Sequence, residues 1–217
     1  MTETRAEPVE AAASLADEAY QRLLADILSA RLIGGSVIQE RRLADRLGVS
    51  RSPMRDALGR LEGQGLLTRN ERGVLTVCVV SLPDYLNAMA LRQLIEPEAV
   101  ALACDHPWGE ALASLDAMWR ELADDPQPDL DFVWRFDDQL HETIARLSGN
   151  LFLWRTVRDM RRYTTIFERQ TNMRRAKPGI DEHRAILDAL REQDREKARS
   201  AMTFHLAHAR ESVLENY

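Results

Sequence analysis

The sequence predicts a mainly α-helical protein in which a small N-terminal unit of three helices and a β-hairpin precedes an all-helical bundle. The first observation is the segment 43–67, where a short apolar helix runs into a glycine turn and an arginine-bearing helix follows at once. The second is the region from residue 84 onward, where apolar residues recur at helical spacing. We therefore expect a disordered tail at 1–16, the first unit at 17–80 and the bundle at 81–217.

Composition narrows the class of protein. The chain has 217 residues, 45% of them hydrophobic and 29% charged, which is typical of a globular protein with a sizeable core. No apolar run approaches the roughly 20 residues needed to span a bilayer, and the polar first residues have no apolar signal core. Cys78 and Cys104 lack CxxC spacing, so we expect free thiols and a cytoplasmic protein.

The first unit is predicted from helical periodicity and glycine breaks. Tyr20, Leu23 and Ile27 place a helix at 17–31, and two glycines at 34–35 end it. The next helix covers 40–47, and Gly48 allows a turn with positive φ. A third helix then runs to about residue 64, with Ser50 or Ser52 as its N-cap.

A short wing follows the third helix. β-prone residues between 66 and 77 flank the turn at 70–73, which predicts a two-stranded hairpin tipped by Arg72 and Gly73. Three helices followed by such a hairpin form a winged helix-turn-helix, whose third helix reads a DNA major groove. On that helix Arg51, Ser52 and Arg55 lie opposite the apolar face.

Charge distribution supports DNA binding. Residues 39–73 hold eight arginines and five acidic residues, a net charge of +3, although the whole chain carries −6. Arginine bonds guanine bidentately and neutralises phosphate. The alternative for any single arginine is a solvated helix face, but the ordered set of helix, turn, basic helix and wing favours DNA.

The segment RRLADRLGVSRSPMRDALGRLEGQGLL, followed by RGV, resembles the winged helix-turn-helix of GntR-family bacterial transcriptional regulators. The resemblance implies that operator DNA is contacted by one arginine of the second helix, by three recognition-helix residues and by the wing tip. These positions are Arg41, Arg51, Ser52, Arg55 and Gly73. Arg72 has no fixed counterpart in the family, and its assignment depends on its place in the wing.

The remainder of the chain is predicted to form six helical segments. They are expected at about 84–104, 109–122, 130–148, 151–171, 180–192 and 194–215, after a linker at 81–83. Proline and glycine clusters separate them, and Pro97 is expected to kink or split the first. No internal repeat is present.

Three histidines and one aspartate adjoin the apolar stripes of three of these segments. Asp137 and His141 are four residues apart on one helix, and His183 and His205 belong to the inward faces of the last two. Imidazole and carboxylate on facing helices are how bundles hold divalent metals. The alternatives are hydrogen-bonded core histidines and a salt-bridged aspartate, and His208 competes with His205.

The bundle also resembles a known domain. The segments LRQLIEPEAVALA, FDDQLHETIARLSGN, DEHRAILDAL and AMTFHL are similar to the FCD effector domain of the FadR-like GntR subgroup. The resemblance implies that Asp137, His141, His183 and His205 hold one divalent cation, with zinc, nickel and manganese not distinguished. Residue 140, often Phe in this motif, is Leu here, at a packing position.

The same resemblance implies a small carboxylate effector, an organic or sugar acid, in the cavity beside the metal. Arg92 matches an arginine that faces this carboxylate, and its guanidinium fork suits that group. The alternative for Arg92 is a structural salt bridge to Glu96, four residues on.

We therefore expect a cytoplasmic, homodimeric transcription factor, a repressor, that binds a palindromic operator and responds to the carboxylate effector. A metal-sensing repressor is a second possibility. A third is an enzyme whose metal activates water, with the N-terminal unit as a localiser, but no separate general base or nucleophile motif supports it.

Overall fold

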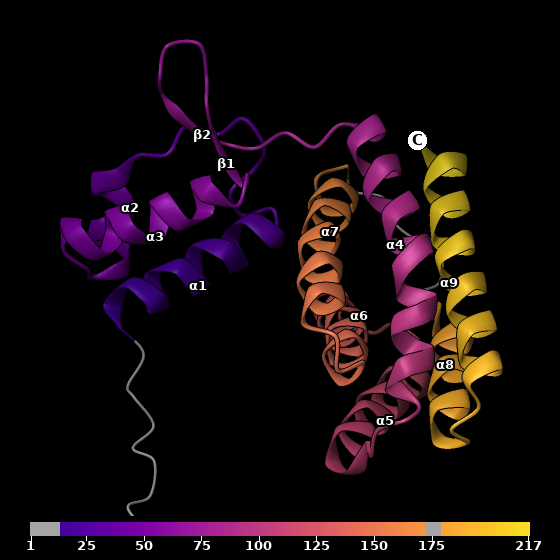
Figure 1. The fold of residues 1–217 in the computed structure, drawn as a ribbon. Helices are drawn as coiled ribbons and strands as arrows, with labels where there is room; N and C mark the ends of the chain where they lie inside the picture. The colour runs from indigo at the N-terminus through magenta and orange to yellow at the C-terminus, as the bar shows by residue number, and fades with distance from the viewer. Residues whose placement is uncertain (1–13, 172–178) are drawn as a thin grey trace, which may run out of the picture. The chain divides into compact units, whose positions relative to one another are not determined.

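The computed structural model describes residues 14–171 and 179–217, and this part of the chain divides between Val79 and Val80 into two units (Figure 1). It is mostly helical, which confirms the predicted fold class. Residues 1–13 of the expected tail at 1–16 lie outside the described residues, as do residues 177–178 of the break before the fifth bundle segment. The tail's last three residues were predicted wrongly, because Ser14 caps the first helix and that helix begins at Leu15. No helix of the described part is long and apolar enough to cross a membrane.

The first unit has three helices and an antiparallel hairpin. Its elements are α1 (Leu15–Leu28), α2 (Glu40–Leu47), α3 (Arg51–Gly63), β1 (Leu67–Arg69) and β2 (Leu75–Val77). Leu67 pairs with Val77 and Arg69 with Leu75, and α1 packs against α3. The core between these helices includes Leu23, Met54 and Leu61, which are almost fully buried.

The predicted turn between α2 and α3 is confirmed. Gly48 has φ +68° at the end of α2, a backbone conformation that glycine adopts without a Cβ clash. Ser50 occupies the N-cap position of α3, but its side chain makes no capping hydrogen bond.

The first helix is shorter at its C-terminal end than predicted. It ends at Leu28, because Ala30 turns the chain with φ +56° and the Leu32 amide bonds back to the Asp26 carbonyl at 2.9 Å. Arg31 leaves the helix and donates from Nε to the buried Asp26 carboxylate at 2.8 Å. Periodicity alone did not reveal this tertiary ion pair.

The second unit is a bundle of six helices within the described residues. They are α4 (Leu82–Ala103), α5 (Gly109–Asp124), α6 (Leu130–Leu147), α7 (Leu151–Gln170), α8 (Ile180–Arg191) and α9 (Arg195–Asn216). The central helix, α4, packs against α9, α7 and α6, and α8 packs against α9 and α5 (Figure 1).

The predicted linker at 81–83 is wrong, because α4 begins at Leu82. Ser81 caps this helix by accepting from the Asp84 amide at 3.3 Å, and the Asp84 carboxylate accepts from the Ser81 amide at 3.0 Å. Pro83 lies in the first turn, where a missing N–H costs nothing. Pro97 does not split α4, which is assigned as one helix through Ala103.

Candidate functional site

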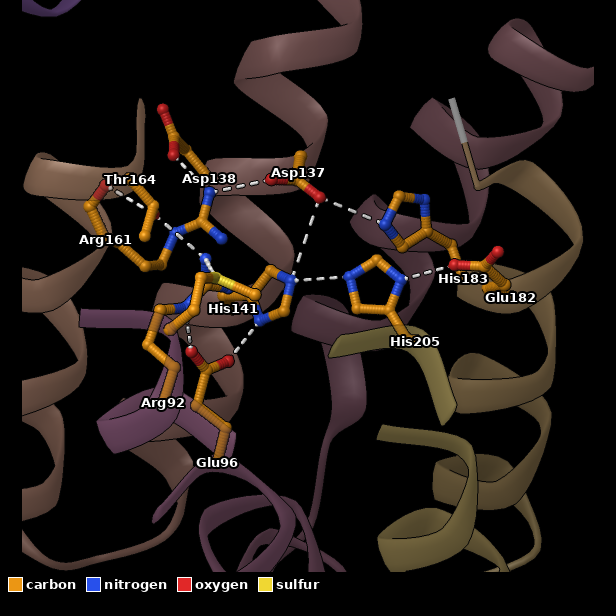
Figure 2. A network of polar contacts seen from close by, with 11 residues as sticks. Arg92, Glu96, Asp137, Asp138, His141, Arg161, Thr164, Glu182, His183 and His205 are labelled. Carbon is orange, nitrogen blue, oxygen red and sulfur yellow. Dashed lines mark hydrogen bonds and ion pairs between the residues drawn. The ribbon is translucent and has the colours of Figure 1, made fainter. Parts of the chain in front are cut away.

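The structure brings Asp137, His141, His183 and His205 together in the core of the bundle. Asp137 and His141 project from α6, His183 from α8 and His205 from α9 (Figure 2). One ligand atom of each lies within 4.8 Å of the other three, and all three histidines are buried. Their positions follow from the apolar stripes, because Phe136, Leu140 and Ile144 turn the same face of α6 into the core.

The separations within this four-residue cluster suit one metal ion. The Asp137 Oδ1 lies 3.0 Å from the His183 Nε2 and 3.7 Å from the His141 Nε2. The two Nε2 atoms of His141 and His205 are 3.2 Å apart. Ligand atoms about 2.1 Å from a tetrahedral ion are separated from one another by about 3.4 Å.

Two carboxylates hold the histidines from behind. The Nδ1 of His141 donates to Glu96 of α4, and the Nδ1 of His205 donates to the Glu182 Oε2 of α8 at 2.9 Å (Figure 2). Both Nε2 atoms therefore point at the centre of the cluster. A carboxylate on the outer nitrogen of a metal-binding histidine fixes its tautomer and raises its basicity.

Burial keeps these two histidines neutral. It lowers the pKa of His205 to about 3 despite the hydrogen bond to Glu182, and it also lowers the pKa of His141 despite the Glu96 charge. A neutral imidazole that donates from Nδ1 carries a bare lone pair on Nε2. Two such lone pairs face each other across the 3.2 Å between His141 and His205, an arrangement that a cation stabilises. The residues therefore fit a divalent metal.

The fourth member of the cluster is held by a buried arginine. The Arg161 Nη2 of α7 donates to the Asp137 Oδ2 at 2.8 Å and also contacts Asp138. Burial alone raises the pKa of Asp137, but Arg161 and the hydrogen bond from His183 outweigh it and hold that pKa well below the usual value. Asp137 thus stays ionised, with Oδ1 directed at the histidines.

Arg92 lies in the wall beside the cluster and makes the salt bridge considered as its alternative role. Its Nε donates to the Glu96 Oε1 at 2.5 Å and its Nη1 to the Thr164 hydroxyl at 3.0 Å. Burial raises the pKa of Glu96, but the charge of Arg92 and the hydrogen bond from His141 hold it far below its usual value. Arg92 also borders a cavity of about 10 Å³.

His208 is not part of the cluster. Its ring is exposed and its Nδ1 contacts the outer oxygen of Glu182. Glu182 therefore contacts both the buried His205 and the exposed His208. Glu96 and Glu182 lie within the segments LRQLIEPEAVALA and DEHRAILDAL, but no pattern assigns either a role at the cluster, and Arg161 lies in no such segment. Each acts on a residue from another helix, which a pattern within one helix does not indicate.

The residues expected to contact DNA are all exposed on the first unit. Their positions are Arg41 on α2, Arg51, Ser52 and Arg55 on α3, and Arg72 and Gly73 at the hairpin turn. Arg55 donates from Nε to the Glu40 Oε1 at 2.9 Å, which fixes its guanidinium beside α2. Met54, Leu58 and Leu61 bury the opposite face of α3.

Local hydrogen bonds fix the conformation of the hairpin turn. The Asn70 Oδ1 accepts from the amides of Arg72 and Val74, each at 3.0 Å, and Gly73 has φ +71°. Arg69 donates to the Gly73 carbonyl at 3.1 Å and pairs with Glu62 of α3. This leaves the Arg72 side chain at an exposed tip whose backbone is fixed.

Both units match known protein families. Residues 15–77 match the family model described as bacterial regulatory proteins, gntR family, and residues 87–208 match the FCD domain. YdhC, an HTH-type transcriptional regulator of Bacillus subtilis (strain 168), is 28% identical over 87% of this chain and 86% of its own. The HTH-type transcriptional repressor RspR of Escherichia coli (strain K12) is 26% identical over 89% of this chain and 86% of its own.

A solved structure shows the same fold. The E. coli protein McbR/YncC superposes with a TM-score of 0.82 at 21% sequence identity, over 94% of this chain and 99% of that one. The names of the relatives describe regulators of transcription rather than enzymes. The chain belongs to the GntR family of bacterial transcriptional regulators and carries an FCD domain.

Proposed function

We propose that this regulator is a cytoplasmic homodimer that represses transcription from a palindromic operator and responds to a small carboxylate bound near a divalent metal. The observation that carries the proposal is the four-residue cluster, in which two histidines are held from behind by Glu96 and Glu182 so that their lone pairs converge. A closed hydrogen-bonded core does not need this arrangement, whereas a metal site does.

DNA binding is assigned to one face of the first unit. Arg51 and Arg55, with Ser52 between them, reach base edges and phosphate from α3, while Arg41 contacts the backbone from α2. Arg72 and Gly73 place the wing against the groove. A dimer of such units matches two half-sites of a palindrome, because a two-fold axis relates both.

The metal is assigned to Asp137, His141, His183 and His205, one ion per subunit. It supplies a fixed positive charge in the core that attracts a carboxylate. Zinc, nickel and manganese all accept imidazole and carboxylate ligands, so the donor set does not select among them. Arg92, held by Glu96 and Thr164 in the cavity wall, presents its guanidinium to the effector. An effector that binds one arrangement of the protein better shifts operator affinity by that difference.

Operator binding is tested by a gel shift on the DNA that flanks the gene itself. We expect Arg51→Ala combined with Arg55→Ala to weaken binding by at least about 30-fold, because two bidentate base contacts are each worth about 1–3 kcal/mol. Arg120→Ala, which removes an exposed arginine from α5, is the matched control and leaves affinity unchanged. Operator affinity that survives the double substitution contradicts the recognition-helix assignment.

The metal is tested by elemental analysis of the purified protein. We expect about one divalent ion per chain in the wild type, and its loss in His183→Ala and His205→Ala. His208→Ala, an exposed histidine outside the cluster, keeps the ion. A wild type that holds no metal and still answers its effector excludes the coordinating role.

A second candidate, a repressor that senses the metal itself, is favoured by the small size of the cavity. About 10 Å³ is room for roughly one water molecule, which leaves little space for an organic ligand without side-chain movement. Operator affinity that changes with Zn²⁺, Ni²⁺ or Mn²⁺ in the absence of any organic acid would establish this role. Affinity that changes only when a carboxylate is added supports the first proposal.

A further inference from the structure

Asp138 follows the cluster residue Asp137 on α6 but is not a member of the four-residue cluster. Successive residues of a helix point about 100° apart, so the two carboxylates leave α6 in different directions. The Asp138 side chain is 42% exposed, against 15% for Asp137, and it lines an open groove of about 550 Å³ together with Arg135 and Gln139. A carboxylate that solvent reaches thus stands next in sequence to one that belongs to the buried cluster.

One arginine joins these two carboxylates. The Arg161 Nη2 of α7 lies 2.8 Å from the Asp137 Oδ2 and also donates to the Asp138 Oδ1 (Figure 2). The Arg161 side chain is only 6% exposed. Burial lowers its pKa, but the charge of Asp137 and then that of Asp138 raise this pKa above its usual value. The buried guanidinium therefore has two counter-charges, one inside the cluster and one outside it.

A divalent ion held by the cluster draws on the same Asp137 charge that Arg161 uses. The Asp137 Oδ1 faces the His183 Nε2 at 3.0 Å, while its Oδ2 faces Arg161. A single negative charge is then shared between a dication and a guanidinium. Buried charges without a partner are costly, so Arg161 needs a second carboxylate once Asp137 is shared. Asp138 is in hydrogen-bond contact with Arg161 and supplies that charge.

The net charge of these groups differs between the empty and the ion-bound protein. Asp137, Asp138 and Arg161 together carry −1 in the empty protein, and the loss of Asp138 leaves a neutral pair. With a divalent ion the same three groups and the ion carry +1, and without Asp138 they carry +2. The neighbouring pair of Arg92 and Glu96 cancels in every case. Loss of Asp138 should therefore penalise the ion-bound protein far more than the empty one.

We propose that Asp138 is a positioning residue for the metal site, which shares Arg161 with Asp137 and so keeps the Asp137 carboxylate available to a divalent cation. This inference rests on the metal assignment of the proposed function. Glu182 supports the cluster through a hydrogen bond to one of its histidines, whereas Asp138 supports it by charge, through Arg161. The outer face of α6 thereby contributes to the affinity of a site on its inner face.

The test measures Zn²⁺ affinity by competition against a chelating dye, and the thermal stability of the empty and the Zn²⁺-loaded protein. Asp138→Asn keeps the shape and removes the charge. We expect it to weaken Zn²⁺ binding about tenfold, the low end of the range for residues behind a metal ligand, because Asp138 is 42% exposed. The empty variant should unfold within about 3 °C of the empty wild type. Asp138→Glu keeps the charge and should recover most of the affinity.

The matched control is Asp131→Asn. It breaks an ion pair between the same two helices, in which the Arg169 Nη1 lies 3.0 Å from the Asp131 Oδ1, and neither residue belongs to the cluster. Zn²⁺ affinity should stay within about twofold of the wild type, because an exposed ion pair away from the site contributes little. A loss equal to that of Asp138→Asn would show that any break between α6 and α7 weakens the site, and would overturn the inference.

Removal of the arginine separates action through Arg161 from action on the ion itself. In Arg161→Met the buried guanidinium is gone, so Asp138→Asn should change Zn²⁺ affinity by less than about threefold. A tenfold loss that persists there would mean that Asp138 acts on the ion directly. If Arg161→Met does not fold, the stability of Asp138→Asn decides: equal destabilisation of the empty and the loaded protein overturns the positioning role.

The wild type distinguishes this inference from the proposed function. Zn²⁺ binding that is equally tight in the wild type and Asp138→Asn refutes only the role of Asp138. A wild type that takes up no Zn²⁺ refutes the metal assignment and, with it, this inference.

Discussion

Glu96 and Glu182 make the same kind of hydrogen bond to the cluster, but their second partners differ. Each accepts a hydrogen bond from the Nδ1 of a cluster histidine. Glu96 is buried and also neutralises Arg92, so its removal leaves a buried guanidinium without its charge partner. Glu182 is the outer carboxylate, and its second oxygen contacts the exposed His208. Substitution of Glu182 therefore isolates the effect on the metal from the effect on folding.

We expect Glu182→Gln to weaken metal binding by about 10- to 100-fold, because the hydrogen bond that orients His205 and raises its basicity is weakened. The measurement is competition for Zn²⁺ against a chelating dye. His208→Ala removes the other partner of Glu182 and leaves metal affinity within about twofold. Equal losses in both variants would show that Glu182 does not support the site without the surface histidine.

Arg55 and Glu40 form an exposed ion pair on the face of the first unit to which we assign DNA binding. Exposed pairs contribute only about 0–1 kcal/mol, so Glu40→Gln is expected to leave stability nearly unchanged. The same change removes a negative charge beside DNA and should raise affinity for random-sequence duplex. Fluorescence anisotropy at several salt concentrations checks this, and weaker binding to random DNA would show that Glu40 holds Arg55 for the phosphates.

At the scale of the element, prediction was accurate where local signals act alone. The bounds of α2 agree with the expected 40–47, because the Gly48 turn ends the helix without help from the rest of the fold. The prediction was wrong at the end of α1, which stops before residue 31. There Arg31 forms an ion pair with Asp26 instead of continuing the helix. At α4 the capping box of Ser81 and Asp84 starts the helix at Leu82, within the predicted linker at 81–83.

The N-caps of the first unit provide a matched pair of substitutions. Ser14 caps α1 through its side chain, and Ser50 occupies the same position of α3 without a side-chain bond. We expect Ser14→Ala to cost about 1 kcal/mol of the unfolding free energy and Ser50→Ala a few tenths at most. Chemical denaturation of both variants measures the difference, and equal costs would contradict the capping assignment.

The Ser14 effect should also depend on pH. Its hydrogen bonds to Asp17, followed by the ion pair with Arg60, hold the pKa of Asp17 below its usual value. A carboxyl with a lowered folded-state pKa stabilises above its unfolded pKa, and this contribution is lost as pH falls through the folded-state value. The gap between Ser14→Ala and the wild type should therefore narrow in acid. A gap that is constant from neutral pH down to pH 2, an interval of roughly the span over which carboxyls titrate, would contradict it.

At the scale of the whole molecule, the sequence predicted which side chains meet but not what surrounds them. The four members of the cluster follow from helical stripes plus family resemblance, since each lies on the inward face of its helix. Glu96, Arg161 and Glu182 position these side chains from α4, α7 and α8. Their contacts with the cluster depend on how these helices pack. Helix packing is a tertiary property that periodicity does not encode.

The division of the chain into two units makes a further prediction about metal removal. All four cluster residues belong to the second unit, so a bound ion stabilises that unit and has no contact assigned in the first. Metal at 1,000 times its Kd adds about 4 kcal/mol to the unit that binds it. We expect calorimetry to show two transitions, of which EDTA lowers only that of the second unit.

Two variants assign these transitions. Ser14→Ala lowers the first-unit transition in the presence and absence of EDTA, because its capping bond lies within α1. His205→Ala abolishes the EDTA effect, because it removes a cluster ligand. A single transition that shifts as one with EDTA would mean that the two units unfold together. The ion would then stabilise the DNA-binding unit as well, and metal loading alone would link the cluster to the operator.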